Sequence, residues 1–309
     1  MEKIKDVIYL DDCRESMIAG FRNELNHDIR RTGFTSFNRH YNWLRKDLTV
    51  FAGMGGSGKS TLYLQLATLQ SKMNDERFAV FSPEQDPPDY FYNDVVHMYL
   101  GTFPNKKYMN EADYFRALDY VKDHFFYIYP ETEAPTPDYI NTRFEQLIET
   151  HGVGGVCVDP FDQLENDWAS TMNRDDKYVS KFLRGCKRFA NQHNVYYDVI
   201  THTNNTVTTN ERGDFNTPHV GNLAGGAKWN NNTDNLIIVH RPYSESDPDN
   251  RETIVKFAKI KKQKIVGVRG EITLTFDRKR NRFMDAGGSP LDENYGYAGD
   301  GEMEFDEPF

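Results

Sequence analysis

Residues 53–61 read Gly53-Met-Gly-Gly-Ser-Gly-Lys-Ser-Thr61 and match the phosphate-binding pattern GxxxxGK[ST] at every fixed position. The preceding residues, 48–52, are apolar and β-prone, and leucines recur in a helix-like stretch from Leu62 to Leu69. A strand, a glycine-rich turn and a helix N-terminus in this order present backbone N–H groups and a positive helix end to an anion. We therefore predict a nucleoside triphosphate site, with a chance glycine-rich turn as the alternative.

Each residue type in this loop has a predicted part in holding ATP, or another NTP or dNTP, together with Mg²⁺. The glycines let backbone amides approach the phosphates, the Lys59 ammonium reaches the β- and γ-phosphates, and the Ser60 hydroxyl ligates Mg²⁺. The loop residues predicted to contact the nucleotide are Gly53, Gly55, Gly56, Ser57, Gly58, Lys59, Ser60 and Thr61.

Two further apolar runs, residues 78–84 and 153–159, each end in a carboxylate. The second predicts a buried strand whose last residue, Asp159, helps to hold Mg²⁺. The first ends in Glu84, which we expect to orient the attacking water, because a general base must lie within hydrogen-bond reach of that water. Asp159 as an ordinary strand end and Glu84 as a cap of the following helix are the alternatives. The carboxylates just after residue 159 are interpreted as loop residues.

Length, hydropathy and cysteine content narrow the class of protein. The 309 residues suffice for one large α/β domain with extensions. No apolar run is long enough to cross a membrane, and the first residues lack the apolar core of a signal peptide, so we expect a cytoplasmic protein without a membrane partner. Cys13, Cys157 and Cys186 are too few and too far apart for a disulfide framework or a zinc ribbon.

The net charge of −10 is concentrated in the last residues. Residues 285–309 contain eight acidic residues and no Lys or Arg, so the remaining body carries about −2. A nearly neutral body with basic loops can still bind a phosphate backbone, and the charge therefore does not exclude DNA.

We divide the chain into an N-terminal linker or oligomerisation arm (1–33), an α/β domain (34–284) and a disordered acidic C-terminal tail (285–309). Strand-like and helix-like segments alternate in the α/β domain, which predicts a mostly parallel central sheet flanked by helices. The expected strands are 48–52, 78–82, 125–129, 155–159, 195–201, 235–240, 253–260 and 271–276.

The motifs, in their order, resemble the RecA-like motor of hexameric replicative DNA helicases: the DnaB family, phage primase–helicases and mitochondrial Twinkle. The resemblance rests on Asp-Leu-Thr-Val-Phe-Ala-Gly53-x4-Gly-Lys-Ser60, then Phe-Ser-Pro-Glu84, then Val-Cys-Val-Asp159-Pro-Phe-Asp162, and extends over roughly residues 34–284. It implies a RecA-like P-loop ATPase that forms a homo-oligomeric ring, a hexamer in relatives. It also implies hydrolysis at subunit interfaces, with Glu84 as the catalytic base, and an origin in a phage that acts in the host cytoplasm.

The same resemblance assigns a sensor and two DNA loops. His202, which ends the run from Tyr196, is similar to the γ-phosphate sensor of phage and mitochondrial relatives, with a structural histidine as the alternative. The polar loop 203–216 and the segment 222–238 look like central-channel loops, although an ordinary turn is the alternative for the second. Some relatives have Lys where this chain has Asn, which weakens a charged contact there. The implied DNA-binding residues are Asn204, Asn205, Arg212, Gly225, Gly226 and Lys228.

Residues 262–270, Lys262-Gln-Lys264-Ile-Val-Gly-Val-Arg269-Gly, align with the family pattern Lys-x-Arg-Phe-x-Gly-x-x-Gly. In relatives the arginine reaches the γ-phosphate of the neighbouring subunit, and Lys262 is expected to contact the nucleotide. Lys264 replaces that arginine here and cannot form a bidentate fork. Either Lys264 acts less effectively, or Arg269 replaces it, or hydrolysis is slow; a solvated strand end is the alternative. Phe276 stacks on the base in the resemblance or belongs to the core.

The two ends carry further expectations. Met17, Ile18, Phe21 and Leu25 recur at helical spacing and look like the linker helix that docks on an adjacent protomer, with packing on its own domain as the alternative. The last residues, from Asp300, resemble acidic tips that end in phenylalanine. They are expected to bind a replication partner such as DNA polymerase or primase, or else only to solubilise the chain.

These features together predict an ATP-dependent replicative helicase that translocates on single-stranded DNA. A RecA- or KaiC-like DNA-dependent ATPase without unwinding activity, and a non-catalytic replication adaptor, are the two rivals. A small-molecule P-loop kinase leaves the later motifs without explanation.

Overall fold

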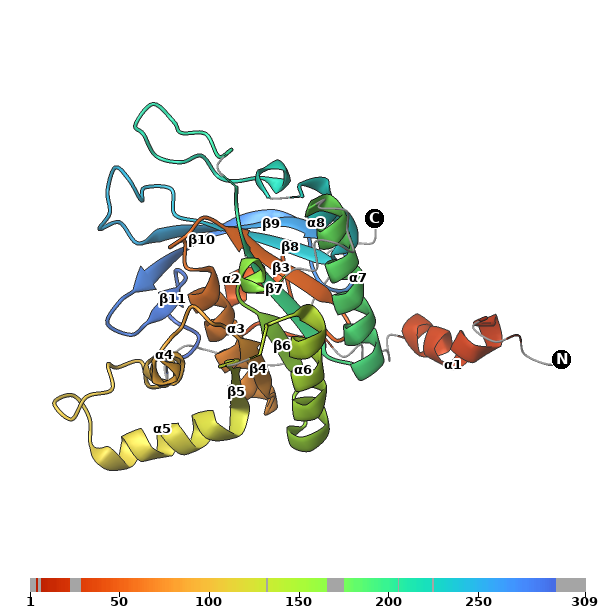
Figure 1. Ribbon diagram of the computed structural model, residues 1–309, viewed down its shortest axis with the longest axis horizontal. Helices are drawn as coiled ribbons and strands as arrows, with labels where there is room; N and C mark the ends of the chain where they lie inside the picture. Colours follow the sequence, from red (N-terminus) through yellow and green to blue (C-terminus); the bar gives the residue numbers. More distant parts are fainter. Residues whose placement is uncertain are drawn as a thin grey trace.

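A nine-stranded sheet forms the centre of the protein, and the expected RecA-like α/β fold is confirmed (Figure 1). The computed structural model describes residues 4, 7–22, 29–131, 133–165, 175–204, 206–223 and 225–292. The strands of the sheet are β3 (Leu48–Gly53), β4 (Phe78–Phe81), β5 (Phe125–Ile128), β6 (Gly155–Val158), β7 (Tyr196–His202), β8 (Asn235–His240), β9 (Glu252–Ile260), β10 (Gly270–Asp277) and β11 (Arg282–Met284).

The strand order is β11-β10-β9-β8-β3-β7-β6-β4-β5. Every pair from β8 to β5 is parallel, whereas β9, β10 and β11 add to the β8 side as antiparallel strands. All eight strands expected from the sequence are present, within one or two residues of their predicted ends. The sheet is therefore mixed but mostly parallel.

Helices cover both faces of the sheet (Figure 1). The helix that follows the glycine-rich loop packs on one face and two later helices pack on the other, so the central strands are buried on both sides. The helices are α1 (Leu10–Phe21), α2 (Thr35–Asn38), α3 (Lys59–Asn74), α4 (Pro88–Leu100), α5 (Glu111–His124), α6 (Pro137–His151), α7 (Asp175–His193) and α8 (Ala227–Asn232), with 3-10 turns η1 (Phe161–Gln163) and η3 (Val220–Asn222).

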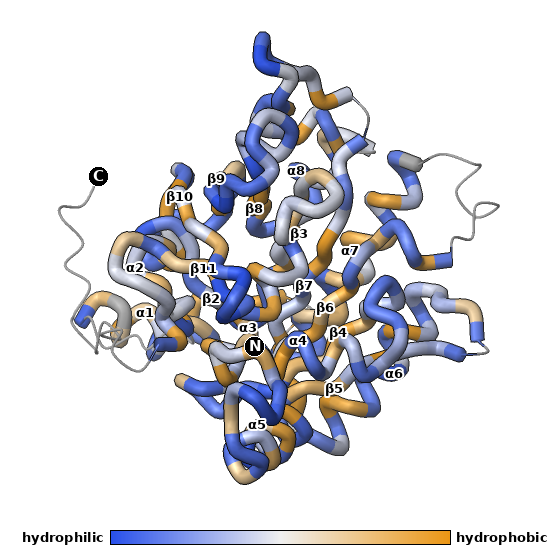
Figure 2. The backbone as a smooth tube through the Cα atoms, turned by 90° about the vertical axis from the view of Figure 1, so that its left-hand side faces the viewer, coloured by the Kyte–Doolittle hydropathy of each residue, from blue (hydrophilic) through white to orange (hydrophobic). Residues whose placement is uncertain are grey.

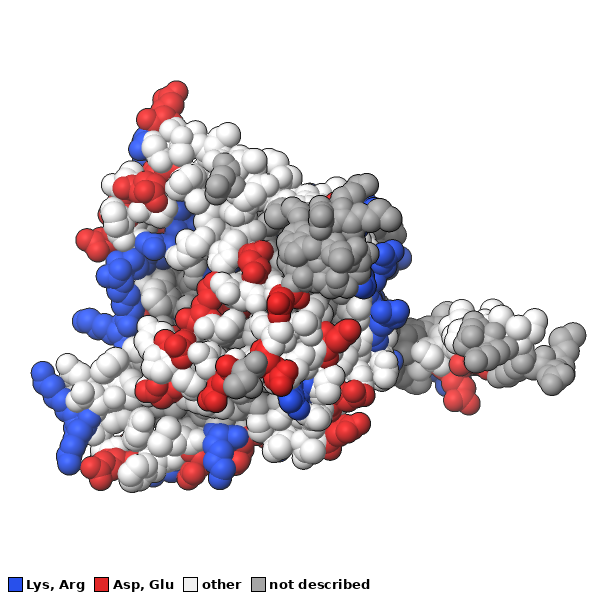
Figure 3. Space-filling view, viewed as in Figure 1, with Lys and Arg blue, Asp and Glu red and all other residues white. Residues whose placement is uncertain are grey.

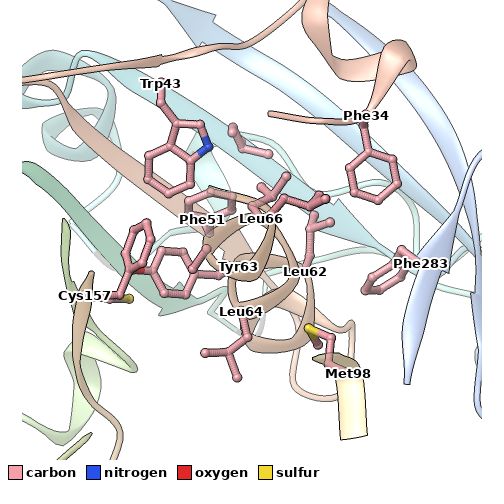
Figure 4. Packing of buried hydrophobic residues seen from close by; sticks show 14 of the residues in the cluster. Phe34, Trp43, Phe51, Leu62, Tyr63, Leu64, Leu66, Met98, Cys157 and Phe283 are labelled. Carbon is pink, nitrogen blue, oxygen red and sulfur yellow. The ribbon is translucent and has the colours of Figure 1, made fainter. Parts of the chain in front are cut away.

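Two hydrophobic clusters hold these layers together. One joins α3 to the sheet, and Figure 4 shows Tyr63 of α3 beside Phe51 and Cys157 and Leu62 turned toward Phe283 of β11. The other joins α6 and α7 to the opposite face. Figure 2 shows hydrophobic residues concentrated around β6 and β7 and hydrophilic residues on the outlying loops. This packing keeps the carboxyl ends of the parallel strands in fixed register.

The packed domain is longer than the predicted range 34–284. Before it, β1 (Ile29–Arg30) pairs with β2 (Trp43–Leu44), and Thr32 is fully buried. After it, Leu291 is buried and Asp292 accepts a 2.8 Å hydrogen bond from Arg282. Part of the predicted arm and the first residues of the predicted tail, 285–292, therefore belong to the domain. Residues 293–309 of that tail lie outside the described residues.

Helix α1 lies apart from the rest of the molecule in Figure 1. Its apolar residues Met17 and Phe21 are 58% and 90% exposed, and Ile18 is also exposed. Packing of these residues on their own domain, one of the two alternatives, is not what the structure shows. Leu25, the fourth member of the pattern, lies outside the described residues.

Candidate nucleotide site at the carboxyl edge of the sheet

The glycine-rich loop leaves β3 at the centre of the sheet. Gly53 lies against β8 so closely that an added Cβ would collide with the Val239 carbonyl oxygen. Gly58 has φ +88° and precedes α3, and an added Cβ there would lie 2.9 Å from Phe283. Gly55 and Gly56 are exposed and have open space around them. The loop thus needs glycine where it packs and leaves room where phosphates would lie.

Lys59 and Ser60 begin α3 and face Asp159. Lys59 is 5% exposed and donates a 2.7 Å hydrogen bond to the Met54 carbonyl inside the loop. Burial lowers the pKa of Lys59 to about 8, against the opposing effect of three nearby carboxylates, Asp159, Glu84 and Asp162. Desolvation of the ammonium therefore favours an anionic ligand, whose charge would compensate for the lost water.

Asp159 follows β6 and is 6% exposed. It accepts hydrogen bonds from the hydroxyls of Ser60 and, at 3.4 Å, Ser82. Burial raises the pKa of Asp159 to about 6, while the Ser60 hydrogen bond and the Lys59 charge oppose that shift. The two predicted metal ligands, Ser60 and Asp159, are therefore adjacent. A divalent cation at this position would favour the ionised carboxylate.

Glu84 lies on the turn that follows β4, at the same edge. Its side chain is exposed and accepts a 3.2 Å hydrogen bond from Gln163. Helix α4 has Pro87 at its N-cap and no side-chain cap hydrogen bond, so Glu84 does not act as its cap. The Tyr127 hydroxyl, 2.8 Å from the Ser82 carbonyl and 3.2 Å from that of Gln85, holds this turn to β5.

His202 is the last residue of β7 and pairs in register with Gly53 of β3. Its Nδ1 lies 3.1 Å from Asp162, which also accepts a hydrogen bond from the His202 backbone N–H at 3.3 Å. Asp162 was not among the residues predicted for the site. Its spacing, three residues after Asp159, was the available signal.

Phe276 approaches the same loop through a second aromatic ring. It is half-buried, and its ring centroid lies 5.0 Å from that of Phe283, which contacts Gly58. Phe276 thus packs on the core and also borders the P-loop region, so both alternatives stay compatible with its position. Phe283 had no signal in the sequence, because it lies in a three-residue strand.

The two predicted DNA loops lie side by side. Thr203 and Leu223 form an isolated bridge, and the Asn204 backbone N–H donates to the Asn222 carbonyl at 2.7 Å. The Asn204 side chain accepts a hydrogen bond from the Thr206 backbone N–H within its own loop. Asn205 lies outside the described residues. The predicted loops therefore form one surface that continues directly from β7.

Arg212 lies exposed at the far turn of the 203–219 loop. The neighbouring Asp214 is buried and accepts hydrogen bonds from the Ser246 backbone at 2.8 Å and the Ser246 hydroxyl at 2.6 Å. These hydrogen bonds lower the pKa of Asp214. The loop is thereby tied to the connection between β8 and β9.

Gly225 and Gly226 precede α8 with φ +82° and +51°. An added Cβ on Gly225 would lie 3.2 Å from Val179 of α7, whereas Gly226 has open space. Gly225 thus approaches a helix rather than a DNA strand, and Gly226 is open to solvent. Lys228 lies in the first turn of α8.

Arginines gather near the ends of the antiparallel strands at this edge. Arg241 follows β8, Arg251 precedes β9 and Arg278 follows β10. Desolvation, then the charges of Arg278 and Arg241, lowers the pKa of Arg251. Figure 3 shows Lys and Arg along the left-hand margin of the molecule and Asp and Glu across the face toward the viewer.

Lys262, Lys264 and Arg269 lie at the opposite edge of the sheet. The Lys262 ammonium forms an ion pair with Asp47, the residue before β3, and the loop 261–269 connects β9 to β10 there. Gly53 is at the other end of β3, roughly 16 Å further along the strand at about 3.3 Å per residue. Lys264 and Arg269 are exposed. None of the three therefore reaches the P-loop of its own chain.

Packing fixes the base of this loop. Asn42 donates a 3.0 Å hydrogen bond to the Val266 carbonyl, and the Val268 backbone N–H donates to the Arg39 carbonyl at 3.1 Å. Burial and the neighbouring Asp234 raise the pKa of Asp47, which Lys262 opposes. The loop is thus anchored to the segment that leads into β3.

Comparison with known proteins identifies the family. The family described as DnaB-like helicase C terminal domain matches residues 30–285. The chain belongs to this DnaB-like family. The match covers nearly the whole packed domain and includes residues 30–33, which the sequence alone had assigned to the arm.

Individual relatives agree with this assignment. The chain is 24% identical over 273 residues to "Twinkle homolog protein, chloroplastic/mitochondrial" of Arabidopsis thaliana, covering 84% of this chain and 37% of that protein. Among solved structures, an isolated helicase-fold ATPase domain has a TM-score of 0.73 at 17% identity, over 90% of this chain and 99% of that one. A DnaB-like replicative helicase, described with its interactions with primase, has a TM-score of 0.70 at 16% identity, over 89% and 68%.

This DnaB-like chain spans little more than a third of the length of the plant relative. In the described part of the chain, no helix is long and apolar enough to cross a membrane. The described residues also contain no group of three or more His, Cys, Asp or Glu side chains that could hold a metal by themselves. Mg²⁺ commonly uses one or two protein ligands beside phosphates and water, so Ser60 and Asp159 fit it.

Proposed function

We propose that this chain is the ATP-driven motor of a ring-shaped replicative DNA helicase that translocates on single-stranded DNA. One observation carries the proposal: Lys59, Asp159, Glu84 and His202 come from four strand ends and meet at one edge of the sheet. In open α/β sheets, ligands bind outside the carboxyl ends of the strands. Family membership supports the same activity.

The residues at this edge fit a Mg²⁺-nucleotide. Backbone amides of the glycine loop and the Lys59 ammonium would hold the phosphates, while Ser60 and Asp159 would hold the metal. Mg²⁺, when bound, supplies positive charge that offsets developing charge on the phosphates. Glu84 would accept the proton of an attacking water, and His202 would contact the γ-phosphate.

A second copy of the chain would complete the site. Lys264 and Arg269 are exposed at the edge away from their own P-loop, so they can serve only the nucleotide of a neighbour. An ammonium stabilises developing charge without the bidentate geometry of arginine, so we expect Lys264 to act, with slower hydrolysis. Lys262 would join it only after leaving Asp47.

Two exposed apolar surfaces support assembly into a ring. One is α1 with Met17 and Phe21, and the other is the α4–α5 hairpin, where Phe103, Tyr108 and Phe115 are each more than half exposed. Both are too apolar to be left in water without cost. Docking of α1 on the next copy would repeat around a closed ring, a hexamer as in relatives.

Single-stranded DNA would pass along the surface formed by the 203–219 loop and the Gly225–Lys228 segment. Asn204, Gly226 and backbone amides there suit phosphate contacts that do not read sequence. The acidic residues after Asp292 would bind a polymerase or primase. A RecA- or KaiC-like ATPase without unwinding remains the second candidate, because Lys264 replaces the arginine expected of a fast motor.

The test is a strand-displacement assay on a forked duplex with ATP and Mg²⁺, run beside ATPase measurements with and without single-stranded DNA. We expect DNA-stimulated hydrolysis and displacement of one strand, and a ring in electron micrographs with a non-hydrolysable ATP analogue. Stimulated hydrolysis without displacement would favour the RecA-like candidate. No turnover at any DNA concentration would contradict the motor and favour an adaptor.

A further inference from the structure

The short turn η1 touches two separate parts of the site. Asp162 accepts hydrogen bonds from the Nδ1 and the backbone N–H of His202. The next residue, Gln163, donates its side-chain amide to Glu84 at 3.2 Å. Adjacent residues of one turn thus hold the proposed sensor and the proposed base.

The sheet topology explains why this turn can reach both. β6 lies between β4 and β7, and the chain leaves β6 through Asp159 directly into η1. A turn in that place has the end of β4, with Glu84, on one side and the end of β7, with His202, on the other. Gln163 faces the first and Asp162 faces the second.

The same turn is anchored to the DNA-facing segments. The Phe161 ring packs edge-on against Trp229, with centroids 5.1 Å apart, and Trp229 follows Lys228 in α8. His202 continues directly into the 203–219 loop. Phe161 is 8% exposed, whereas Asp162 and Gln163 are exposed, so the turn has a fixed base and two polar contacts that can change.

We propose that Asp162 and Gln163 are positioning residues that transmit the state of the DNA-facing loops to Glu84. This inference rests on the proposed helicase function and adds the connection between its two sites. A displacement of the 203–219 loop moves His202, His202 moves the η1 turn through Asp162, and the turn reorients the Glu84 carboxylate through Gln163. Neither residue needs to touch the nucleotide.

The experiment measures ATP hydrolysis with and without saturating single-stranded DNA for wild type, Asp162→Asn, Gln163→Met and the double variant. Gln163→Met keeps the side-chain length and removes the amide donor, and Asp162→Asn removes the charge. Glu165→Gln, on the same exposed segment, is the matched control. Because the substituted side chains are exposed, circular dichroism and thermal unfolding are expected to match wild type.

We expect each single variant to lower the ratio of DNA-stimulated to unstimulated kcat by about three- to tenfold, the effect of losing one hydrogen bond to a charged group. The KM for ATP and the Kd for single-stranded DNA stay within about twofold of wild type, because neither residue touches a ligand. The double variant resembles the single ones, because coupled residues are not additive.

An unchanged ratio in the variants, with or without a lower kcat, overturns the linkage and leaves the helicase proposal intact. Additive losses in the double variant also overturn it, since independent contacts would then be at work. Wild type without any DNA stimulation refutes the proposed function itself, and the linkage with it.

Discussion

The two edges of the sheet differ in how complete they are. At the carboxyl edge, residues from β3, β4, β6 and β7 meet around the P-loop and contact one another. At the amino edge, Lys264 and Arg269 are exposed on a loop that is firmly anchored at its base. One edge is a nearly assembled site, and the other is a rigid support for groups that lie far from their own P-loop.

This difference indicates where the reaction needs a second copy. Charge stabilisation by a preorganised group is worth most when the group is held rigidly before the reaction. The 261–269 loop is held by Asn42 and by the Lys262–Asp47 ion pair, next to the strand that leads to its own P-loop. A subunit could therefore couple its own nucleotide to the one that it serves in a neighbour.

The largest expected effect is at the carboxyl edge. Lys59→Ala removes the P-loop ammonium and should lower ATP hydrolysis by about 10²–10³-fold, because one preorganised charge is lost from the transition state. Unfolding temperature should not fall, since a buried ammonium is costly to desolvate. ATPase assays and thermal unfolding check this. Hydrolysis at the wild-type rate would contradict the nucleotide assignment.

The second effect tests the amino edge. Lys264→Ala should lower kcat by about 10–100-fold while nucleotide binding stays near wild type, because the group acts only on developing charge in a neighbour. ATPase assays of the variant alone and of mixtures measure this. Mixing it with Lys59→Ala should restore activity, since mixed rings contain interfaces with an intact lysine on each side.

Two further outcomes sharpen this test. Lys264→Arg should raise kcat several-fold if the position serves the γ-phosphate, because guanidinium binds phosphate through two parallel hydrogen bonds. Arg269→Ala is the matched control. If only Arg269→Ala impairs hydrolysis, the role belongs to Arg269; if mixing restores nothing, action between subunits is refuted.

A smaller effect concerns pH and Asp159. Its pKa is raised to about 6, so the protonated form is favoured in the folded chain, and this residue adds stability as pH falls from about 6 toward 3.8. Mg²⁺ needs the ionised form, so its apparent affinity should drop about fourfold between roughly pH 7.5 and pH 5.5. Mg²⁺ titrations of nucleotide binding measure this. Asp159→Asn should bind Mg²⁺ weakly at both pH values, and an equal pH response in that variant would point to another group.

The smallest expected effect concerns the DNA-facing loop. Arg212→Ala should reduce the slope of log K against log salt for single-stranded DNA by about 0.7, because one phosphate contact releases one counterion fewer. Fluorescence anisotropy at several salt concentrations measures the slope. Arg278→Ala, outside that loop, is the control. An unchanged slope for Arg212→Ala would remove Arg212 from the DNA path.

Local patterns predicted the fold and most of the candidate site well. Apolar runs that end in Asp159, Glu84 and His202 indicated both the strands and their polar ends, since buried parallel strands read as continuous hydrophobic segments. The contacts of Asp162 with His202 and of Gln163 with Glu84 were not predictable, because they join residues 40 and 79 positions apart. The limits of the domain also differed, since Thr32 and Leu291 are buried by distant partners.

The sequence alone determined that a glycine loop would follow a buried strand, because GxxxxGK[ST] requires that backbone geometry and the flanking runs have the matching periods. Only the tertiary structure decided which strand ends are neighbours, and hence that Lys59, Asp159, Glu84 and His202 share one edge while Lys262 and Lys264 lie at the other. Strand order is set by how helices pack on both faces of the sheet. That packing depends on contacts between residues far apart in the chain, which no local pattern records.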